Sequence, residues 1–485
     1  MATLMIQGTA SSVGKSMITA GLLRVMAQDG LRVAPFKAQN MSNNSFITLE
    51  GDEMGRAQVL QAQGAGLRPH ARMNPLLIKP EGDMTAQLVV RGRVYGQYSA
   101  SEYERLKPRF MELILEDLHT LEKTTDVVVI EGAGSPAEIN LRKNDLVNMG
   151  LATRINSPVL LVGDIDRGGV FAALYGTLKL LDKREQELIK GTLINKFRGD
   201  RSLLDPGIRQ IEALMKKDVL GVIPFFDLPL EEEDGMGNYP GAYTGGLDVA
   251  VIRLPHLSNL SDFDALKSEE GLSLRFVDAL ERLGQPDVLI LPGTKNTLRD
   301  LRWLKKGGLY EGIMSLRETR IMGICGGYQI LGEVVRDPDG IEGDIAMEEG
   351  LGLIPMETRM KPFKVTRQSR GVLTDDETVA VRGYEIHMGK SLFLKAPSPL
   401  LRLENGEEEG YQSSDKRIVG TYLHGIFDSP SFREGFFNPI RREKGLKAVK
   451  SRDYEALRET YLDQLASVIR TSLDMEKIYR IVEAG

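Results

Sequence analysis

The fold of the first half of the chain is decided by Thr3-Leu4-Met5-Ile6-Gln7-Gly8-Thr9-Ala10-Ser11-Ser12-Val13-Gly14-Lys15-Ser16. A short apolar run, typical of a buried strand, leads into a glycine-rich turn, and the residues after the turn have helical spacing. A phosphate-binding loop needs this order, because glycines let backbone N–H groups converge on an anion at a helix N-terminus. We therefore expect the loop to bind ATP through Gly8, Thr9, Ser12, Val13, Gly14, Lys15 and Ser16.

Lys15 is expected to reach the outer phosphates, and the Ser16 hydroxyl is expected to hold Mg²⁺. The loop is one residue longer than the usual phosphate-loop motif. This longer spacing is typical of dethiobiotin-synthetase-like ATPases, which the loop resembles. A glycine-rich turn that binds nothing is the alternative, and the Lys-Ser pair after the strand argues against it.

Five further apolar runs alternate with helical patterns, which predicts a doubly wound parallel α/β sheet. These runs are Arg32–Phe36, Asp126–Ile130, Pro158–Gly163, Gly191–Asn195 and Val219–Ile223. Ligands bind where such strands end.

We expect Lys37 and Asn40 to face the transferring phosphoryl group or the substrate, and Asn195 to contact ATP. Magnesium ligands are predicted to be Ser16, Glu131 and Asp52, with Glu53 as the alternative to Asp52.

Composition excludes several classes of protein. The 62 Lys and Arg residues against 68 Asp and Glu give a net charge of −6, so no overall cationic field attracts nucleic acid. A single cysteine excludes an intramolecular disulfide and every zinc site that needs two thiolates. The first residues lack the pattern of a signal peptide, and no apolar stretch approaches the length of a membrane span. We expect a cytoplasmic protein that acts on small molecules.

A charge run followed by glycines at Leu230–Gly246 predicts a domain boundary. After it, Asp248–Arg253, Asp287–Leu291 and Arg320–Ile324 are expected to be parallel strands of a second α/β domain, with shorter strands between Ala346 and Tyr422. Helical spacing returns from about Asp453 to Val482. The predicted domains are therefore residues 1–230, residues 247–435 and a helical tail of residues 436–485.

Gly323-Ile324-Cys325-Gly326-Gly327-Tyr328-Gln329 follows one of these strands and opens a helix. A cysteine on such a strand-to-helix turn has the geometry of a nucleophile elbow, and the helix N-terminus favours its thiolate. A lone cysteine is more often a small buried hydrophobe, but the glycines on both sides favour a nucleophile.

A thiolate nucleophile needs a base, and the chain has five histidines. His424, before a glycine turn, is the first candidate, and His387 is the second. The turn at Gly293, after another strand, is expected to help stabilise an oxyanion.

Together these strings resemble the adenosylcobyric acid synthase family, glutamine-hydrolysing enzymes of cobalamin biosynthesis. The resemblance spans the chain and includes Phe36-Lys37-Ala38-Gln39-Asn40-Met41-Ser42-Asn43-Asn44, Met73–Pro80, the cysteine turn and Gly383–His387. It implies a dethiobiotin-synthetase-like domain followed by a cobalamin-type class I glutamine amidotransferase domain.

The resemblance also implies roles for residues. Cys325 would be the glutaminase nucleophile and His424 its base, while Gly293, Gly326 and Gln329 would serve the oxyanion or bind glutamine. Many class I amidotransferases have a glutamate two residues after the histidine, where this chain has Ile426. The group that orients His424 is therefore open, with Asp428 and Glu385 as candidates.

By resemblance, the reaction is ATP-, Mg²⁺- and glutamine-dependent amidation of the b, d, e and g carboxylates of adenosylcobyrinic acid a,c-diamide. The segment Gln87–Tyr98 is a candidate contact for that macrocycle, and a homo-oligomer is possible. The alternatives are a corrin a,c-diamide synthase, an amidotransferase for a cell-wall precursor, and a partition-type ATPase switch. The last would leave the cysteine turn without a role.

Overall fold

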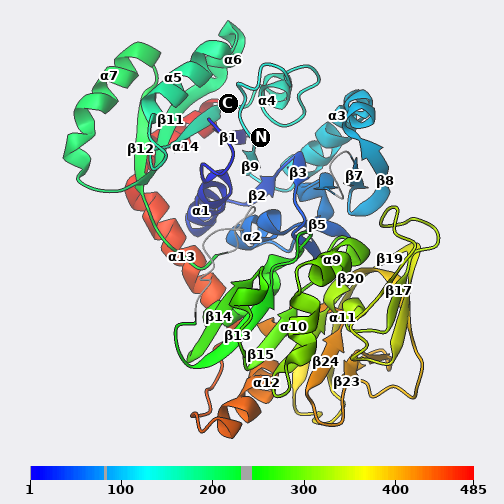
Figure 1. Cartoon of the computed structure of the whole chain (residues 1–485). Coiled ribbons are helices and arrows are strands. Elements are labelled where there is room, and N and C mark those ends of the chain that lie inside the picture. Colours follow the sequence, from blue (N-terminus) through cyan, green and yellow to red (C-terminus); the bar gives the residue numbers. More distant parts are fainter. Residues whose placement is uncertain (1, 81–84, 231–242) are drawn as a thin grey trace. The chain divides into compact units, whose positions relative to one another are not determined.

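The computed structural model describes residues 2–80, 85–230 and 243–485, which form two compact units (Figure 1). Unit 1 comprises residues Met1–Ser42, Met54–Asp234 and Arg458–Gly485. Unit 2 comprises residues Asn43–Glu53 and Gly235–Leu457. Most of the predicted boundary at Leu230–Gly246 lies outside the described residues.

Unit 1 is built on a six-stranded sheet in the order β12-β11-β10-β1-β9-β2, and every adjacent pair is parallel. The strands are β1 (Ala2–Gly8), β2 (Val33–Phe36), β9 (Val127–Glu131), β10 (Val159–Asp164), β11 (Ile189–Phe197) and β12 (Asp218–Pro224). All six strands predicted for the first half are confirmed.

Alternate residues of these strands enter two different cores. Met5 and Ile130 face one core, whereas Leu4, Ile6 and Val129 face the other. The sheet is thus covered on both faces, as the continuous Val/Ile/Leu runs predict. Its helices are α1 (Lys15–Gln28), α2 (Arg56–Gly64), α3 (Ala100–Glu122), α4 (Met149–Ile155), α5 (Val170–Leu180), α6 (Lys183–Leu188) and α7 (Asp205–Met215).

A smaller sheet in the order β3-β6-β7-β8 follows β2. Its strands are β3 (Gln39–Met41), β6 (Leu76–Pro80), β7 (Thr85–Val90) and β8 (Arg93–Ser99). The predicted macrocycle contact, Gln87–Tyr98, lies on the antiparallel pair β7 and β8. A capping box at Ser99 and Glu102 then starts α3.

Unit 2 contains a sheet in the order β14-β13-β15-β16-β24-β23, parallel except for β23 at one edge. The strands are β13 (Leu247–Ile252), β14 (Leu272–Val277), β15 (Val288–Leu291), β16 (Arg320–Ile324), β23 (Tyr411–Gln412) and β24 (Ile418–Thr421). Its helices are α8 (Asp264–Lys267), α9 (Thr297–Lys306), α10 (Leu309–Ser315), α11 (Gly326–Ile330) and α12 (Pro430–Glu443). The three strands predicted here are confirmed.

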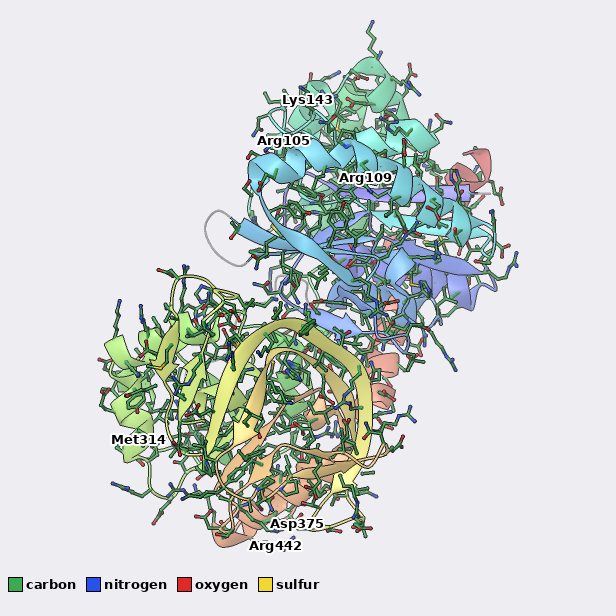
Figure 2. All side chains as sticks on the ribbon, turned by 90° about the vertical axis from the view of Figure 1, so that its right-hand side faces the viewer. Arg105, Arg109, Lys143, Met314, Asp375 and Arg442 are labelled. Atoms are coloured by element: carbon green, nitrogen blue, oxygen red, sulfur yellow. The ribbon has the colours of Figure 1, made fainter. Side chains whose placement is uncertain are left out.

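Between residues 346 and 422 the prediction of short strands is confirmed for five strands of two to four residues, but it misses two long ones. The structure has a long antiparallel pair, β19 (Met356–Leu373) and β20 (Ala380–Phe393), seen in Figure 2 as curved yellow ribbons. A register shift between Arg359 and Lys364 interrupts the pairing, and such bulges bend strands. The other strands of this sheet are β17 (Val334–Arg336), β18 (Met347–Glu349), β21 (Leu401–Leu403), β22 (Glu408–Glu409) and β25 (Leu423–His424).

The structure distributes the predicted tail over both units. Residues up to 457 belong to unit 2, whereas most of α13 (Tyr454–Ser472) and all of α14 (Met475–Ala484) belong to unit 1. The apolar side of α13, including Leu465 and Ile469, joins the core formed with α1. Gly21 of α1 allows this approach, because a Cβ there would lie 2.5 Å from Cγ1 of Ile469.

Within the described part of the chain, no helix combines the length and the hydropathy that a bilayer crossing demands.

Replacing Leu465 by Ala should destabilise unit 1, although the residue is far along the chain from β1. Its side chain is fully buried, so the cavity should lower the free energy of unfolding by about 2–5 kcal/mol. Urea unfolding measures the change in free energy, and hydrogen exchange measures the protection of the β1 amides. Gln464→Ala, exposed on the same helix, is the control, and unchanged protection of β1 in Leu465→Ala would contradict the assignment of α13 to unit 1.

Candidate functional site

Cys325 occupies the turn between β16 and α11, as the sequence predicts. Its backbone has φ 53° and ψ −110°, an uncommon conformation for a residue with a side chain, and one that concentrates at functional sites. The turn is held by the Cys325 N–H, which donates to the Thr421 carbonyl at 2.8 Å. The cysteine therefore sits at the N-terminus of a helix on a strained elbow.

Three glycines are required around this elbow. A Cβ on Gly327 would lie 2.0 Å from the Leu291 carbonyl oxygen, and one on Gly326 would lie 2.5 Å from Thr294. A Cβ on Gly293 would lie 2.9 Å from the His424 ring. The two predicted oxyanion glycines, Gly293 and Gly326, thus lie at the loop after β15 and at the start of α11, each with no room for a side chain.

His424 reaches the cysteine through strand pairing. β24 is parallel to β16, with Ile324 opposite Thr421, so the residues after both strands emerge at the same edge of the sheet. The His424 ring is fully buried, and within the described residues its Nε2 has no hydrogen-bond partner. The Cys325 thiol donates to the Ile386 carbonyl at 3.5 Å.

Asp262 orients His424. One carboxylate oxygen lies 2.7 Å from Nδ1 of His424, and the other accepts the Gly425 N–H at 2.9 Å. A carboxylate at Nδ1 fixes the ring with its Nε2 facing the nucleophile. The prediction that Asp428 or Glu385 orients His424 is therefore wrong, because Asp262 takes this position.

Glu385 instead accepts hydrogen bonds from Arg367 and Ser369. Burial alone would raise the pKa of Glu385, but hydrogen bonds from His387, Arg367 and Ser369 lower it to about 2. Glu385 is thus a fixed anion in a separate network.

Asp262 lies in the short 3₁₀ helix Leu260–Phe263, which follows β13. A signal existed: β13 is parallel to its neighbours, so residues after it share the edge of the sheet with Cys325. Asp262 and His424 are 162 positions apart in the sequence, so no local motif contains both residues.

The pair changes the charge of the imidazole. Burial alone would lower the pKa of His424, but the Asp262 carboxylate and the Cys325 sulfur outweigh it and raise the pKa to about 10. His424 is therefore cationic at neutral pH. An imidazolium beside a cysteine stabilises the thiolate and is ready to donate a proton.

Two further residues predicted for this site are Gln329, which is buried, and His387, which is partly buried. The Gln329 side chain donates to the Met388 carbonyl at 2.9 Å and accepts from the Thr297 hydroxyl at 3.1 Å. Its amide is thus engaged within the protein. His387 stacks on Tyr422 with 3.7 Å between ring centroids. His424, not His387, has the carboxylate at Nδ1 that a general base requires.

In unit 1 the predicted phosphate loop follows β1 and precedes α1. Gly14 has φ 97°, and a Cβ there would lie 2.1 Å from Nδ2 of Asn195. This Nδ2 donates to the Val13 carbonyl at 2.8 Å. Ser12 also has a positive φ, and its carbonyl accepts from Lys196.

Three hydrogen bonds and the small size of Gly8 also shape the loop. The Thr9 N–H donates to the Val162 carbonyl at 2.9 Å. Gly8 leaves no room for a Cβ, which would lie 2.6 Å from Val13. Lys15 donates to the carbonyls of Ala10 and Gly134. The loop is thus a preformed backbone turn at a helix N-terminus, which suits a phosphate.

Glu131, at the end of β9, is the centre of the predicted metal site. Its carboxylate accepts from the Ser16 hydroxyl at 2.8 Å, from Lys37 at 3.0 Å and from Gln61 at 2.5 Å. Burial alone would raise the pKa of Glu131, but the cation of Lys37 together with these hydrogen bonds holds it below its usual value. Glu131 is therefore an anion next to the phosphate loop.

Asp52 belongs to the segment that folds with unit 2, and the Ser16–Glu131 contact forms without it. Within the described residues, no group of three His, Cys, Asp or Glu side chains is placed to hold a metal. Asn40 donates to Gln58 at 2.8 Å and is buried in a polar cluster of unit 1.

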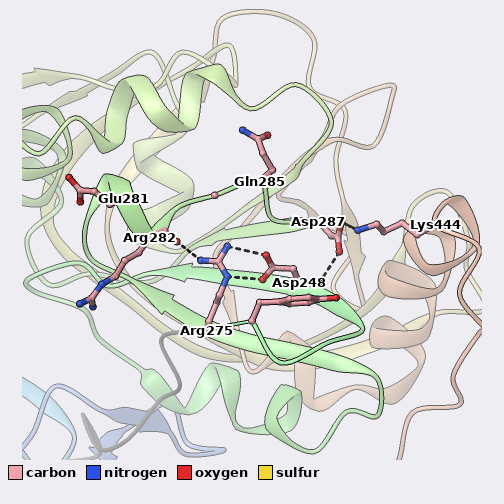
Figure 3. Close-up of a pocket in the computed structure, with 9 residues that line it drawn as sticks. Asp248, Arg275, Glu281, Arg282, Gln285, Asp287 and Lys444 are labelled. Atoms are coloured by element: carbon pink, nitrogen blue, oxygen red, sulfur yellow. Dashed lines mark hydrogen bonds and ion pairs between the residues drawn. The ribbon is translucent and has the colours of Figure 1, made fainter.

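A pocket of about 480 Å³ in unit 2 lies elsewhere (Figure 3). Asp248 lies at the start of β13 and Asp287 directly precedes β15, so the pocket is at the amino ends of these strands, whereas Cys325 follows the carboxyl end of β16. Four of its charged residues are also paired with each other, Asp248 with Arg275 at 2.8 Å and Asp287 with Lys444. We assign it no part in the chemistry.

Replacing Asp262 by Asn should lower the pKa of His424 by about one unit or more, because the ring loses a neighbouring carboxylate. NMR titration of ¹³C-labelled histidine, assigned with a His424→Gln variant, measures this. Asp300→Asn is the matched control, since Asp300 lies 2.6 Å from His256 and raises the pKa of that ring only. A His424 titration that is the same in Asp262→Asn and wild type would contradict the pairing.

Comparison with known proteins agrees with this division into two sites. Residues 4–236 match the CobQ/CobB/MinD/ParA nucleotide binding domain, and residues 248–432 match the CobB/CobQ-like glutamine amidotransferase domain.

Curated relatives match the whole chain. A cobyric acid synthase of Clostridium botulinum (strain Loch Maree / Type A3) is 52% identical over 99% of both chains. One of Caldanaerobacter subterraneus subsp. tengcongensis is 51% identical over 99% of this chain and 98% of its own. The phosphate loop, the cysteine elbow and this likeness from end to end place the chain in the cobyric acid synthase family of glutamine amidotransferases.

Proposed function

We propose that the chain amidates the b, d, e and g carboxylates of adenosylcobyrinic acid a,c-diamide, using ATP and ammonia from glutamine, to give adenosylcobyric acid. The observation that carries this proposal is the presence, in one chain, of an amide-cleaving Cys325–His424–Asp262 arrangement and a phosphate loop. The identity of the acceptor is supported by the relatives described above, which are cobyric acid synthases.

Glutamine hydrolysis is proposed to begin at Cys325, beside the cationic His424. The thiolate attacks the side-chain amide carbon of glutamine, and N–H groups at Gly293 and Gly326 are proposed to stabilise the resulting oxyanion. Cationic His424 gives its proton to the departing ammonia. Neutral His424 then takes a proton from water as the water attacks the thioester, which releases glutamate and restores the cation.

Ammonia needs an activated acceptor. In unit 1 the γ-phosphoryl group of ATP would be transferred to a carboxylate oxygen of the substrate, and ammonia would displace phosphate to leave the amide. Lys15 and Lys37 would neutralise charge on the phosphoryl oxygens. The chemistry repeats on each carboxylate, so one pair of sites serves all four positions.

The residues of the loop fit ATP and Mg²⁺. Backbone N–H groups of residues 8–16 would hold the phosphates, and Ser16 with Glu131 would hold the metal, because a hydroxyl and a carboxylate 2.8 Å apart are oxygen ligands of the kind Mg²⁺ prefers. Mg²⁺ would supply charge neutralisation at the phosphoryl group. Asp52 as a further ligand and Asn195 as an ATP contact stay predictions.

A partition-type switch protein would share the nucleotide-binding fold but would have no use for the strained Cys325 elbow. A corrin a,c-diamide synthase or a cell-wall amidotransferase would share both sites, and only the acceptor distinguishes these enzymes. The acceptor therefore has to be tested directly.

Cys325→Ala should lose amidation with glutamine by about 10³-fold or more and regain it with free ammonium, because only the source of ammonia is removed. Mass spectrometry of adenosylcobyrinic acid a,c-diamide incubated with protein, ATP and Mg²⁺ measures up to four amidations. A corrinoid whose mass never changes, although glutamate is released, would show that the acceptor is wrong.

Lys15→Ala should differ from Cys325→Ala in that ammonium does not rescue it. Amidation of the corrinoid with either nitrogen source should fall by about 10²-fold or more, because the phosphoryl group loses one of its two proposed lysine cations. Lys123→Ala, an exposed lysine of the same unit, is the control. Amidation at the wild-type rate in Lys15→Ala would exclude the phosphate loop from the reaction.

A further inference from the structure

Residues Asn43–Glu53 fall within the stretch that matches the nucleotide-binding domain, yet they fold with unit 2. The segment forms β4 (Ser45–Ile47) and the start of β5 (Glu53–Gly55), which pair with each other. Ile47 packs with Tyr384 and Ile386 in a small apolar cluster. Glu53 forms a buried ion pair with Lys364 of β19 and accepts from the Ser45 hydroxyl at 2.8 Å.

The segment contacts the loop that carries Asp262. The Ser45 N–H donates to the side-chain oxygen of Asn259 at 3.0 Å, and the Asn44 side chain accepts the Leu260 N–H at 3.0 Å. Asn259 has φ 55° and directly precedes the 3₁₀ helix of Asp262. Two hydrogen bonds thus hold the strained start of the turn that presents the carboxylate to His424.

The same segment also holds Tyr384, whose ring packs against a face of the His424 ring. The Tyr384 hydroxyl donates to the Ser45 carbonyl at 2.9 Å, and the Tyr384 ring stacks on His424 with 5.4 Å between centroids. The Ser45 backbone therefore binds, through its N–H and its carbonyl, both the loop that orients the imidazole and the ring that packs against it.

We infer that Asn43–Glu53 is a positioning element of the glutaminase site: Asn44 and Ser45 fix Asp262 and Tyr384, and through them the orientation and charge of His424. The inference rests on the proposed role of His424 as the proton donor. It means that the amidotransferase site is completed by residues from the first half of the chain. A catalytic imidazole loses rate when its support loosens, even though the support never touches substrate.

Asn44→Ala tests this. Loss of one hydrogen bond to the Asp262 loop should lower kcat for glutamine hydrolysis by about 3- to 10-fold, with KM changed by less than about twofold. The alkaline limb of the pH profile should move to lower pH, because a displaced Asp262 raises the pKa of His424 less. Asn44→Asp keeps an acceptor oxygen and should restore most of kcat. Leu49→Ala, exposed between β4 and β5, is the control and should match wild type.

Glutamate release is measured in the full chain, with and without ATP, Mg²⁺ and the corrinoid. A wild-type pH profile and kcat in Asn44→Ala would overturn the inference while leaving the proposed function intact. A wild-type chain that never releases glutamate would overturn the proposed function itself. If Asn44→Ala fails to fold, Tyr384→Phe decides, since it keeps the ring and removes the hydroxyl that donates to Ser45. A wild-type kcat and pH profile in that variant would also overturn the inference.

Discussion

The contact between Asp262 and His424 is the interaction on which the glutaminase half depends. A buried imidazole would ordinarily be neutral, because burial disfavours charge. The carboxylate 2.7 Å from Nδ1 and the sulfur of Cys325 reverse this preference. The site therefore holds a cationic imidazole beside Cys325 before any substrate arrives, and a cation next to a cysteine favours the thiolate that amide cleavage needs.

Parallel sheets place this pair and the phosphate loop by the same constraint. In each unit the reactive groups follow the carboxyl ends of strands, where backbone turns and helix N-termini meet. Lys15 lies in the loop region after β1, and Glu131 is the last residue of β9. These two strands are neighbours in the sheet of unit 1. Cys325 and His424 follow β16 and β24 in the same way in unit 2. The pocket at the amino ends of β13 and β15, with its paired charges, has no such convergence.

Much of this could be predicted from the sequence because the signals are local. The phosphate loop and the Cys325 elbow are each contained in about ten residues, and the strands that carry them are continuous apolar runs. Asp262 escaped prediction because its partner lies in a distant segment, and the sequence suggested nearer acids instead. The placement of Asn43–Glu53 and α13 escaped for the same reason, since only packing decides which core a segment joins. The length of β19 and β20 was missed because polar residues and turn signals interrupt their alternation.

The proposed reaction requires that the cysteine site supply the nitrogen of the new corrinoid amides. Its most direct test gives wild-type protein ATP, Mg²⁺ and adenosylcobyrinic acid a,c-diamide with [amide-¹⁵N]glutamine and a similar concentration of unlabelled ammonium, followed by mass spectrometry of the product. The new amides should carry mainly ¹⁵N, because the ammonia comes from glutamine. Amides that carry only ¹⁴N, although labelled glutamine is consumed, would contradict a coupling of the two sites.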